Sequence, residues 1–350
     1  MKALLLTSPS SLMFTDIETP QPAAGDVRVK IAACGICGSD VHGYTGSTGR
    51  RVPPLVMGHE AAGTIDAVGP DVSGEMIGQR VALDSTVFCS ECEFCRNGQE
   101  NLCTDRQVLG VSCDAYRRHG CFAEYVIVPK RCVYPLPDHM DFIAASLLEP
   151  LTIGLQAVRL GNAGPTTRSA VVVGAGTIGL AIVAALKAYG VQRIAAVDLD
   201  AGRLKEAMDL GADDVFDAAQ VNPKQLTEWG ASSVDTDGAD MVLEAVGAAA
   251  SVNTAIHAVT RGGTVVLVGN VSPAVEIPLQ TIVTRQIRLQ GSCASAGCYP
   301  EAIRFAASGK VDLSRFVSRV APLAEGAGWF ERLHNRETGL LKVVLQPSEP

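Results

Sequence analysis

The chain has 350 residues, of which 47% are hydrophobic and 19% are charged, and its net charge is −8. This length predicts about two domains, and the composition excludes a disordered chain. The negative charge argues against a nucleic acid or an anionic membrane as partner, and no apolar run approaches the roughly 20 residues that span a bilayer. The start of the chain does not resemble a secretory signal, so we expect a cytoplasmic protein. Eleven cysteines in that compartment favour metal ligation over disulfides.

The first part of the chain has the pattern of a small β-barrel. Short apolar stretches at residues 2–6, 27–33 and 61–68 are separated by turns rich in glycine and proline. Many short strands with glycine at the corners are typical of compact barrels rather than of helical domains. We therefore expect this part to be mostly β-structure.

Four cysteines follow within a polar stretch, at Cys89, Cys92, Cys95 and Cys103. Thiolates at this spacing can surround one tetrahedral ion, and a complete thiolate shell leaves no position for a substrate. The spacing therefore predicts a structural zinc that holds together a loop without its own core. An iron–sulfur cluster is an alternative, although its bacterial signature carries proline after the last cysteine, where this chain has Thr104. Four ordinary buried cysteines are the remaining alternative.

A strand–turn–helix–strand unit begins near the middle of the chain. Apolar residues 170–173 and 193–197 predict two buried strands, with a helix over residues 177–189 between them. The turn after the first strand carries glycines in the G-x-G-x-x-G spacing, at Gly174, Gly176 and Gly179. An acidic residue, Asp198, follows the second strand. Together these features predict a dinucleotide-binding unit, whereas the glycine spacing alone would be weak evidence.

Each residue of this unit has a physical role in that prediction. Gly174 permits the tight turn, Gly176 lets the backbone approach a pyrophosphate, and Gly179 allows the helix to pack closely on the strand. The pyrophosphate would rest on the free N–H groups at the positive end of the helix. Asp198 would accept hydrogen bonds from the ribose hydroxyls and repel a 2′-phosphate, so we expect NAD rather than NADP.

The alternation of strands and helices continues after Asp198. Strands are predicted at residues 214–216, 239–245, 264–268 and 286–291, and helices at residues 203–210 and 248–259. This order is typical of a doubly wound parallel sheet.

Several motifs together resemble the zinc-dependent medium-chain dehydrogenases, in particular the polyol branch that includes sorbitol dehydrogenase. The motifs are Cys-Gly-Ile-Cys-Gly-Ser-Asp-Val-His at residues 34–42, Gly-His-Glu at 58–60, the four-cysteine loop, Leu-Glu-Pro-Leu at 148–151, and the glycine turn at 174–179. Glutamate in the fourth of these motifs is the feature that resembles the polyol branch. The resemblance extends from residue 1 to about residue 345.

This resemblance implies a catalytic zinc whose ligands are far apart in sequence. Cys37 and His59 match the family's zinc ligands, and residue type alone would not distinguish either from an ordinary packed side chain. Glu60 and Glu149 match carboxylates that ligate the ion or hold its bound water and a substrate hydroxyl. Which glutamate ligates in the resting enzyme stays open. The resemblance also implies that Ser39 receives the alcohol proton and passes it through the cofactor ribose to His42.

The cofactor site implied by the resemblance includes further residues of the second half. Thr177 and Ile178 belong to the glycine turn, Arg203 matches a residue near the adenosine ribose, and Val268 and Ser292 match positions that line the nicotinamide. The implied fold is a GroES-like β-barrel catalytic domain, residues 1–150 and 293–350, around a Rossmann NAD-binding domain, residues 151–292. We expect the active site in the cleft between the domains, with zinc at two sites and a homodimer or homotetramer in solution.

The expected reaction is hydride transfer from a secondary alcohol or polyol, phosphorylated or not, to NAD. Two departures from the polyol branch leave the substrate open. The branch has an aromatic residue after the relay histidine, where this chain has Gly43 followed by Tyr44, and an arginine–tyrosine pair where this chain has Ala294 and Ser295. Threonine or a simple secondary alcohol is the alternative substrate. A substrate phosphate would need a cation nearby, and the loop candidates are Arg50, Arg51, Arg117 and Arg118. A quinone reductase or an NAD-binding redox sensor without turnover is the alternative function.

Overall fold

The computed structural model describes residues 1–231 and 237–347, and the chain forms two compact units. Unit 1 comprises Met1–Glu149, Tyr299–Ala307 and Leu313–Pro350, and unit 2 comprises Pro150–Cys298 and Ser308–Asp312. Unit 2 thus continues past residue 292, where the sequence analysis placed a boundary. In the described residues, no helix combines the length and the apolar character that crossing a membrane requires.

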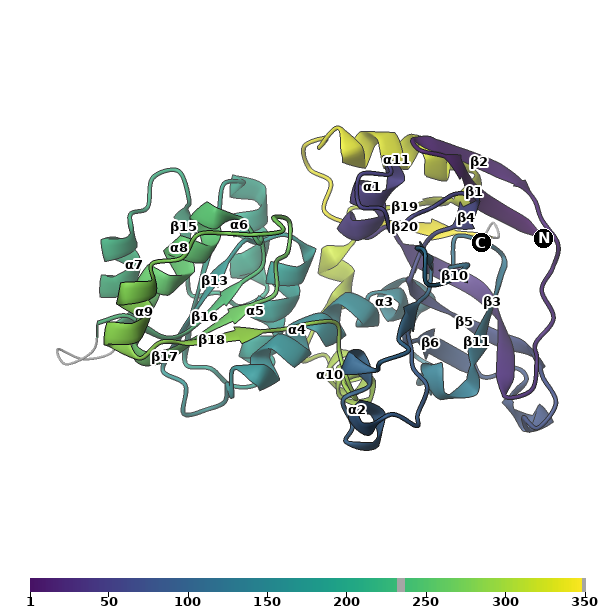
Figure 1. Cartoon of the computed structure of the whole chain (residues 1–350), viewed down its shortest axis with the longest axis horizontal. Coiled ribbons are helices and arrows are strands. Elements are labelled where there is room, and N and C mark those ends of the chain that lie inside the picture. The colour runs from purple at the N-terminus through teal and green to yellow at the C-terminus, as the bar shows by residue number, and fades with distance from the viewer. Residues whose placement is uncertain (232–236, 348–350) are drawn as a thin grey trace. The chain divides into compact units, whose positions relative to one another are not determined.

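Unit 1 is built mainly from short, largely antiparallel strands (Figure 1). Its largest sheet has seven strands in the order β12-β6-β5-β3-β20-β19, with β11 paired to β3, and a smaller sheet has the order β2-β1-β4. Two short ladders, β7–β8 and β9–β10, close loops. The strands are β1 Lys2–Ser8, β2 Ser11–Asp16, β3 Asp26–Gly35, β4 Leu55–Val56, β5 Glu60–Val68, β6 Arg80–Leu83, β7 Thr86–Val87, β8 Gln107–Val108, β9 Val111–Ser112, β10 Arg117–Arg118, β11 Tyr125–Pro129, β12 Val133–Pro135, β19 Arg319–Pro322 and β20 Val343–Gln346.

The helices of unit 1 are short. They are α1 Gly38–Tyr44, α2 Glu93–Arg96, α3 Phe142–Ser146, α10 Tyr299–Ala307 and α11 Gly326–His334, with 3-10 turns at Gly74–Met76, Glu100–Leu102, Lys130–Cys132, Leu313–Phe316 and Leu323–Glu325. One longer helix, α4 Leu148–Leu160, starts in unit 1 and continues in unit 2.

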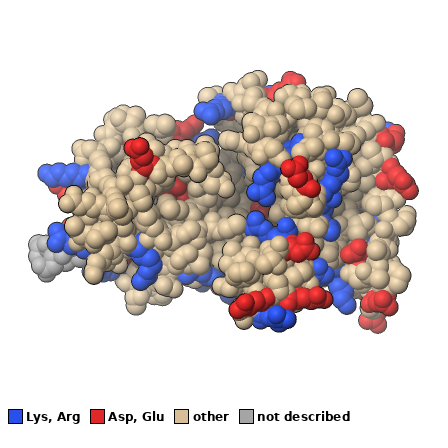
Figure 2. Space-filling model, viewed as in Figure 1, with Lys and Arg blue, Asp and Glu red and all other residues tan. Residues whose placement is uncertain are grey.

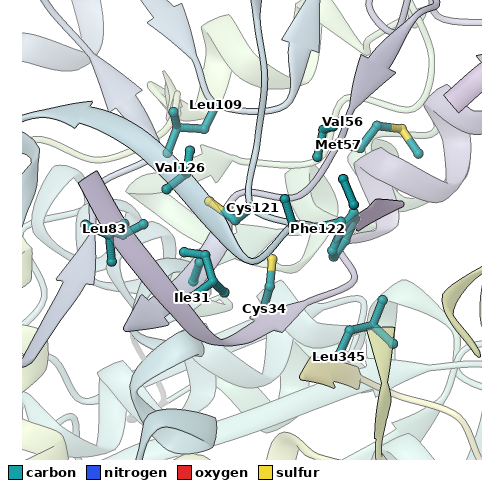
Figure 3. Packing of buried hydrophobic residues seen from close by; sticks show 14 of the residues in the cluster. Ile31, Cys34, Val56, Met57, Leu83, Leu109, Cys121, Phe122, Val126 and Leu345 are labelled. Carbon is teal, nitrogen blue, oxygen red and sulfur yellow. The ribbon is translucent and has the colours of Figure 1, made fainter. Parts of the chain in front are cut away.

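One hydrophobic core joins the two sheets of unit 1. Leu4 and Leu6 come from the small sheet, and Ile31, Leu83 and Leu345 come from the large one. Figure 3 shows Ile31, Leu83 and Leu345 around the sulfur atoms of Cys34 and Cys121 and the ring of Phe122. Burying side chains of this size from both sheets stabilises the scaffold by about 1.5–3 kcal/mol for each. The predicted ligands Cys37 and His59 lie next to the ends of β3 and β5, so this core sets their positions.

Unit 2 is a six-stranded parallel sheet with helices around it (Figure 1). In the strand order β15-β14-β13-β16-β17-β18, the chain starts at β13 and adds β14 and β15 on one side. It then returns to add β16, β17 and β18 on the other side, which is the doubly wound arrangement. The strands are β13 Ser169–Val173, β14 Arg193–Asp198, β15 Asp214–Asp217, β16 Ala239–Glu244, β17 Val259–Leu267 and β18 Arg288–Gly291. The helices are α5 Thr177–Ala188, α6 Ala201–Asp209, α7 Pro223–Gly230, α8 Ala249–Ala258 and α9 Leu279–Arg285.

The predicted elements of unit 2 are present, with two strand boundaries that were wrong. Strand β17 begins at Val259, five residues before the predicted start at residue 264. The sequence analysis began the last strand at Gln286, but this residue ends α9 in a left-handed conformation, with φ 52°, and the strand begins at Arg288. Helices α7 and α9 were not predicted. The start of α7 did carry a signal, because Asn222 and Gln225 form a capping box followed by proline at the first helical position.

Charged side chains of both signs are distributed over the visible face of unit 1 (Figure 2). Lysine and arginine lie next to aspartate and glutamate there, without a broad field of one sign on this face. This face therefore lacks the basic patch that binding of a polyanion requires.

Candidate metal centres and cofactor site

Unit 1 brings three of the predicted site residues together. One ligand atom from each of Cys37, His59 and Glu60 lies within 4.8 Å of the others. Cys37 is the N-cap of α1, and its Sγ accepts hydrogen bonds from the backbone N and the Oγ of Ser39, at 3.5 and 3.4 Å. His59 and Glu60 lie where β5 begins, beside the end of β3, because Gly35 pairs with Glu60 in the ladder.

A buried carboxylate supports His59 from behind. Asp40 is fully buried, and its Oδ2 lies 3.4 Å from Nδ1 of His59. Burial raises the pKa of Asp40, but His59 and Arg51 outweigh it and hold that pKa below its usual range. Burial lowers the pKa of His59, whereas Asp40 and Cys37 raise it above its ordinary value. A carboxylate on one ring nitrogen is the usual arrangement for a histidine that binds a metal through the other.

Glu60 is paired with a lysine that the sequence analysis did not single out. Nζ of Lys342 lies 2.7 Å from both Oε1 and Oε2 of Glu60, and it also donates to the carbonyl of Ile36 at 3.0 Å. Both side chains are 1% exposed. Burial lowers the pKa of Lys342, but Glu60 and Cys37 raise it, so the lysine carries its charge inside the protein.

Glu149 lies in the first turn of α4 and does not belong to the set within 4.8 Å. Its Oε1 accepts a hydrogen bond from Oγ of Ser85 at 3.1 Å. Burial raises the pKa of Glu149 to about 7, with a further contribution from the Glu60 carboxylate, while His59 and Ser85 act in the opposite direction. The carboxyl group is therefore close enough to His59 and Glu60 to interact with them electrostatically.

Ser39 and His42 lie on α1, and both are exposed, as a route for a proton toward solvent requires. The carbonyl of His42 accepts hydrogen bonds from Thr45 and Ser47, while the hydroxyl of Ser39 is adjacent to the Cys37 sulfur. The serine hydroxyl therefore lies next to the position of a metal ion bound by Cys37.

The four cysteines of the β7–β8 loop also converge. Their sulfur atoms all lie within 4.8 Å of one another, and Cys89 Sγ is 3.5 Å from Cys103 Sγ. Backbone N–H groups lower the pKa of Cys92 to about 6, while burial raises that of Cys95 to about 12. Four thiols at these distances fit a tetrahedral zinc, whose bonds to sulfur are ~2.3 Å long. The mixed sulfur, nitrogen and oxygen set of the first cluster fits a catalytic zinc with an open position.

The glycine turn of unit 2 has the geometry that a pyrophosphate requires. Gly174 has φ +95°, which favours glycine, and a Cβ on Gly179 would lie 1.7 Å from the carbonyl oxygen of Gly174. A Cβ on Gly176 would meet nothing within 4 Å, so open space lies above this residue. Gly176 is also the N-cap of α5 and provides no side chain to its free N–H groups. The turn therefore offers an unobstructed anion site at the start of the helix, where Thr177 and Ile178 are the first residues.

The other predicted cofactor residues lie at the carboxyl ends of strands in the same unit. Asp198 ends β14, and its two oxygens accept from the backbone N of Ala175 at 2.6 Å and of Asp200 at 2.9 Å. These bonds fix the carboxylate against the glycine turn. Val268 follows β17, Ser292 follows β18, and Oγ of Ser292 is buried without a hydrogen-bond partner among the described residues. Arg203 is exposed on α6.

The two departures from the polyol pattern have structural explanations. Tyr44 does not replace the missing aromatic residue, because its ring packs 5.6 Å from that of Phe330 and its hydroxyl donates to the carbonyl of Ser10. In unit 2, Oγ of Ser295 is buried and lies 3.0 Å from Oγ1 of Thr152. The hydroxyl of Ser295 therefore does not replace the substrate contacts that an arginine or tyrosine makes at this segment in the polyol branch.

The sequence analysis did not identify Asp40 or Lys342 as functional residues, and it considered Arg51 only as one of several loop cations for a substrate phosphate. Asp40 lies inside the motif at residues 34–42, three residues after Cys37, where an acidic residue is typical of a helix start. This spacing could have identified it. Lys342 is a lysine within an apolar stretch, which indicates a buried charge with a partner. Nothing in the local sequence distinguishes Arg51 from its neighbour Arg50.

Comparisons with known proteins support this description. Residues 23–138 match the alcohol dehydrogenase GroES-like domain, and residues 177–308 match the zinc-binding dehydrogenase family. The chain is 36% identical to L-idonate 5-dehydrogenase of Vitis vinifera over 84% of this chain and 80% of that protein. It is 33% identical to sorbitol dehydrogenase of Bacillus subtilis over 99% of this chain and 98% of that protein.

A solved structure has the same fold along the whole chain. The NADH complex of an Escherichia coli alcohol dehydrogenase superposes with a TM-score of 0.90 at 31% identity and covers 99% of both chains. The predicted combination of a GroES-like domain and a doubly wound domain is confirmed. Because these matches span it from end to end, the chain belongs to the zinc-dependent medium-chain dehydrogenases, in the branch that includes sorbitol dehydrogenase.

Proposed function

We propose that this protein transfers a hydride from a secondary alcohol or polyol to NAD. The observation that carries the proposal is the convergence of Cys37, His59 and Glu60, residues from separate segments, on a site with sulfur, nitrogen and oxygen donors. A zinc ion held there would act as a Lewis acid that lowers the pKa of a bound alcohol. The relatives named for L-idonate and sorbitol support a polyol as the substrate class.

Cys37 and His59 would provide two of the ligands, and a glutamate the third. Glu60 is the nearer candidate, and its salt bridge does not prevent ligation because each carboxylate oxygen has a second lone pair. Glu149 would then hold a water or a substrate hydroxyl through the carboxyl group that Ser85 orients. The hydroxyl of Ser39 would accept the substrate proton, and His42 would release it to solvent.

NAD would be held by unit 2. The pyrophosphate would contact the free N–H groups at Gly176, Thr177 and Ile178, with Gly174 and Gly179 shaping the turn. The Asp198 carboxylate would bind the adenosine ribose, with Arg203 nearby, and Val268 and Ser292 would line the nicotinamide. The hydroxyl of Ser292 is buried and has no hydrogen-bond partner in the described part of the chain, which supports a role for this residue toward a ligand.

The substrate range should be broader than that of a strict sorbitol dehydrogenase. Gly43, Ala294 and Ser295 provide none of the substrate contacts of the branch, so fewer donors are left unpaired by a substrate with fewer hydroxyls. A phosphorylated substrate is less favoured, because Arg51 pairs with Asp40 and Arg117 donates to the carbonyls of Pro53 and Pro54. Threonine and simple secondary alcohols stay as alternatives.

The test is a panel of polyols, sugar phosphates, threonine and secondary alcohols, with NADH formation as the readout and metal analysis of the same sample. We expect NADH formation with at least one polyol and zinc at both sites. Cys37→Ser should abolish turnover and remove only the catalytic ion, whereas the control Cys113→Ser should change neither. If both ions are bound and no alcohol reduces NAD, the protein is the redox sensor; NADPH-dependent reduction of a quinone would indicate the reductase instead.

We also propose that the protein is a homodimer or homotetramer in the cytoplasm. Among the strands of the described residues, β18 is the last in the sheet order of unit 2, so its outer edge has no neighbouring strand to pair its backbone groups. Val271, Leu279 and Val283 are 63, 66 and 65% exposed in the same unit, in α9 and the loop before it. A second copy that pairs along β18 would satisfy the edge and bury apolar side chains.

A further inference from the structure

Arg51 is a buried arginine beside the candidate catalytic metal site. Its side chain is 6% exposed. Nη2 lies 3.0 Å from Oδ1 of Asp40 and 3.4 Å from Oγ of Ser39. Nη1 donates to the carbonyl of Arg50 at 3.1 Å, which fixes the plane of the guanidinium. The guanidinium thus contacts both the carboxylate behind His59 and the hydroxyl next to Cys37.

Gly43 provides the room for this arginine. A Cβ on Gly43 would lie 2.3 Å from Cγ of Arg51, within the distance that atoms essentially never reach. The φ angle of Gly43 is not in the left-handed region, so the glycine is required by packing rather than by backbone conformation. The glycine that departs from the polyol pattern and the buried arginine therefore form one structural feature.

Asp40 transmits the position of Arg51 to the metal ligands. Its Oδ1 is held by Arg51, and its Oδ2 accepts the N–H of Cys37 at 3.4 Å and lies 3.4 Å from Nδ1 of His59. The carboxylate therefore lies between the arginine on one side and two candidate zinc ligands on the other. An ionised carboxylate buried in this way requires a cationic partner.

The backbone of Arg51 is also anchored. It forms an isolated parallel bridge with Ser112 of β9, and the N–H of Ser112 donates to the carbonyl of Arg50 at 3.2 Å. The backbone of Arg51 is thus fixed, and its side chain packs over Gly43 to contact Asp40. The arrangement is suited to holding another group in place.

We propose that Arg51 is a positioning residue of the catalytic centre, which acts through Asp40 on His59 and directly on Ser39. The absence of a side chain at Gly43 leaves the space that the Arg51 side chain occupies. Arg51 fixes the carboxylate so that His59 presents its other ring nitrogen to the ion. It also donates to the Ser39 hydroxyl, so that the oxygen that would receive the substrate proton keeps one orientation. Lysine cannot replace it fully, because an ammonium group lacks the planar fork that reaches two acceptors at fixed angles. This proposal rests on the catalytic zinc proposed above.

The test uses the full-length zinc-loaded protein with the variants Arg51→Met, Arg51→Lys and Gly43→Ala. Arg50→Met is the matched control, because Arg50 is the exposed neighbour and contributes only its carbonyl to this arrangement. Two quantities are measured: the affinity for zinc at the Cys37–His59 site, from chelator competition, and the visible spectrum after cobalt replaces zinc at that site alone. Loss of a hydrogen bond that orients a metal ligand typically lowers the affinity for the metal by about 10–100-fold.

We expect Arg51→Met and Gly43→Ala to lower the affinity for zinc by about 10–100-fold and to change the cobalt spectrum. Arg51→Lys should retain part of the affinity that Arg51→Met loses, and Arg50→Met should match the wild type. If Arg51→Met does not fold, Gly43→Ala and Arg51→Lys decide the question. Variants that lower only the melting temperature, with an unchanged cobalt spectrum and zinc affinity, would show that Arg51 has a purely structural role. A wild type that binds no ion at Cys37 and His59 would instead overturn the proposed function itself.

Discussion

Nζ of Lys342 is equidistant, at 2.7 Å, from the two carboxylate oxygens of Glu60, and neither side chain reaches solvent. The pair connects the residue directly before β20, near the end of the chain, to Glu60, which is the first residue of β5 and one of the candidate zinc ligands. The C-terminal segment thus takes part in the metal site of unit 1 through its lysine. Folding of this segment back onto the first half is a requirement for the site to be complete.

Replacing Lys342 should destabilise the protein strongly. Lys342→Met leaves the Glu60 carboxylate buried without its cation, and breaking a buried pair in this way typically costs about 3–5 kcal/mol. The measurement is the free energy of unfolding in urea, compared with Lys30→Met, which removes an exposed lysine of β3. Equal stability of the two variants would contradict the importance of the pair.

A buried aspartate should make stability depend on pH. Asp84 is 6% exposed, and burial raises its pKa to about 7, with Thr86 donating to Oδ1 at 2.8 Å. Because the folded state then binds this proton more tightly than the unfolded state, the contribution of Asp84 to stability is greatest at low pH and is lost as pH rises from about 4 to about 7.

The variant Asp84→Asn keeps the acceptor for Thr86 and removes the titration. Between pH 5.5 and pH 8, the wild type should lose about 2 kcal/mol of unfolding free energy relative to this variant, since one pKa unit corresponds to about 1.4 kcal/mol. Urea unfolding at both pH values checks this, with Asp71→Asn, an exposed aspartate, as the control. A constant difference between wild type and Asp84→Asn would refute the prediction.

The cofactor preference should depend on Asp198. Its carboxylate lies against the glycine turn, where a 2′-phosphate would meet a like charge, and such contacts cost several kcal/mol. Asp198→Ala should therefore lower the ratio of kcat/KM for NAD over NADP by about 10–100-fold, chiefly through weaker use of NAD. The control is Glu206→Gln, which removes a carboxylate of α6 outside the turn. An unchanged ratio in Asp198→Ala would mean that another residue selects the cofactor.

Removing one cysteine of the loop should separate the two metal sites. Cys92→Ser breaks the four-thiolate set, so one of the two ions should be lost while the ion at Cys37 and His59 stays. The loop between β7 and β8 has few buried residues, and we expect it to become sensitive to proteolysis. Metal analysis and limited proteolysis measure both effects, and Cys113→Ser serves as the control. Retention of both ions by Cys92→Ser would contradict the structural site.

The prediction from sequence succeeded where the signal is local. Strand β13, the glycine turn and α5 were predicted from contiguous residues whose pattern indicates a strand, a tight turn and a helix. The four cysteines of the loop also lie close together in the sequence. The candidate catalytic centre depends on contacts between distant segments. Lys342 and Glu60 are 282 positions apart, and Arg51 differs from Arg50 only in the direction that its side chain takes in the fold. Family resemblance supplied Cys37 and His59, but it could not indicate a contact that this chain makes through its own Gly43 and Arg51. Roles assigned to Ser39, His42 and Glu149 stay predictions.

The exposed apolar side chains of α9 should control association. A charge at Val283, which is 65% exposed, would lie within an interface that covers α9, and burying an unpaired carboxylate there is unfavourable. Val283→Glu should therefore convert a dimer into a monomer, or a tetramer into a smaller species, as measured by light scattering after size-exclusion chromatography. Met13→Glu is the matched control, because Met13 is 53% exposed on β2, which belongs to the other unit. If the wild type is a monomer, or if only Met13→Glu changes the mass, association does not use β18 and α9.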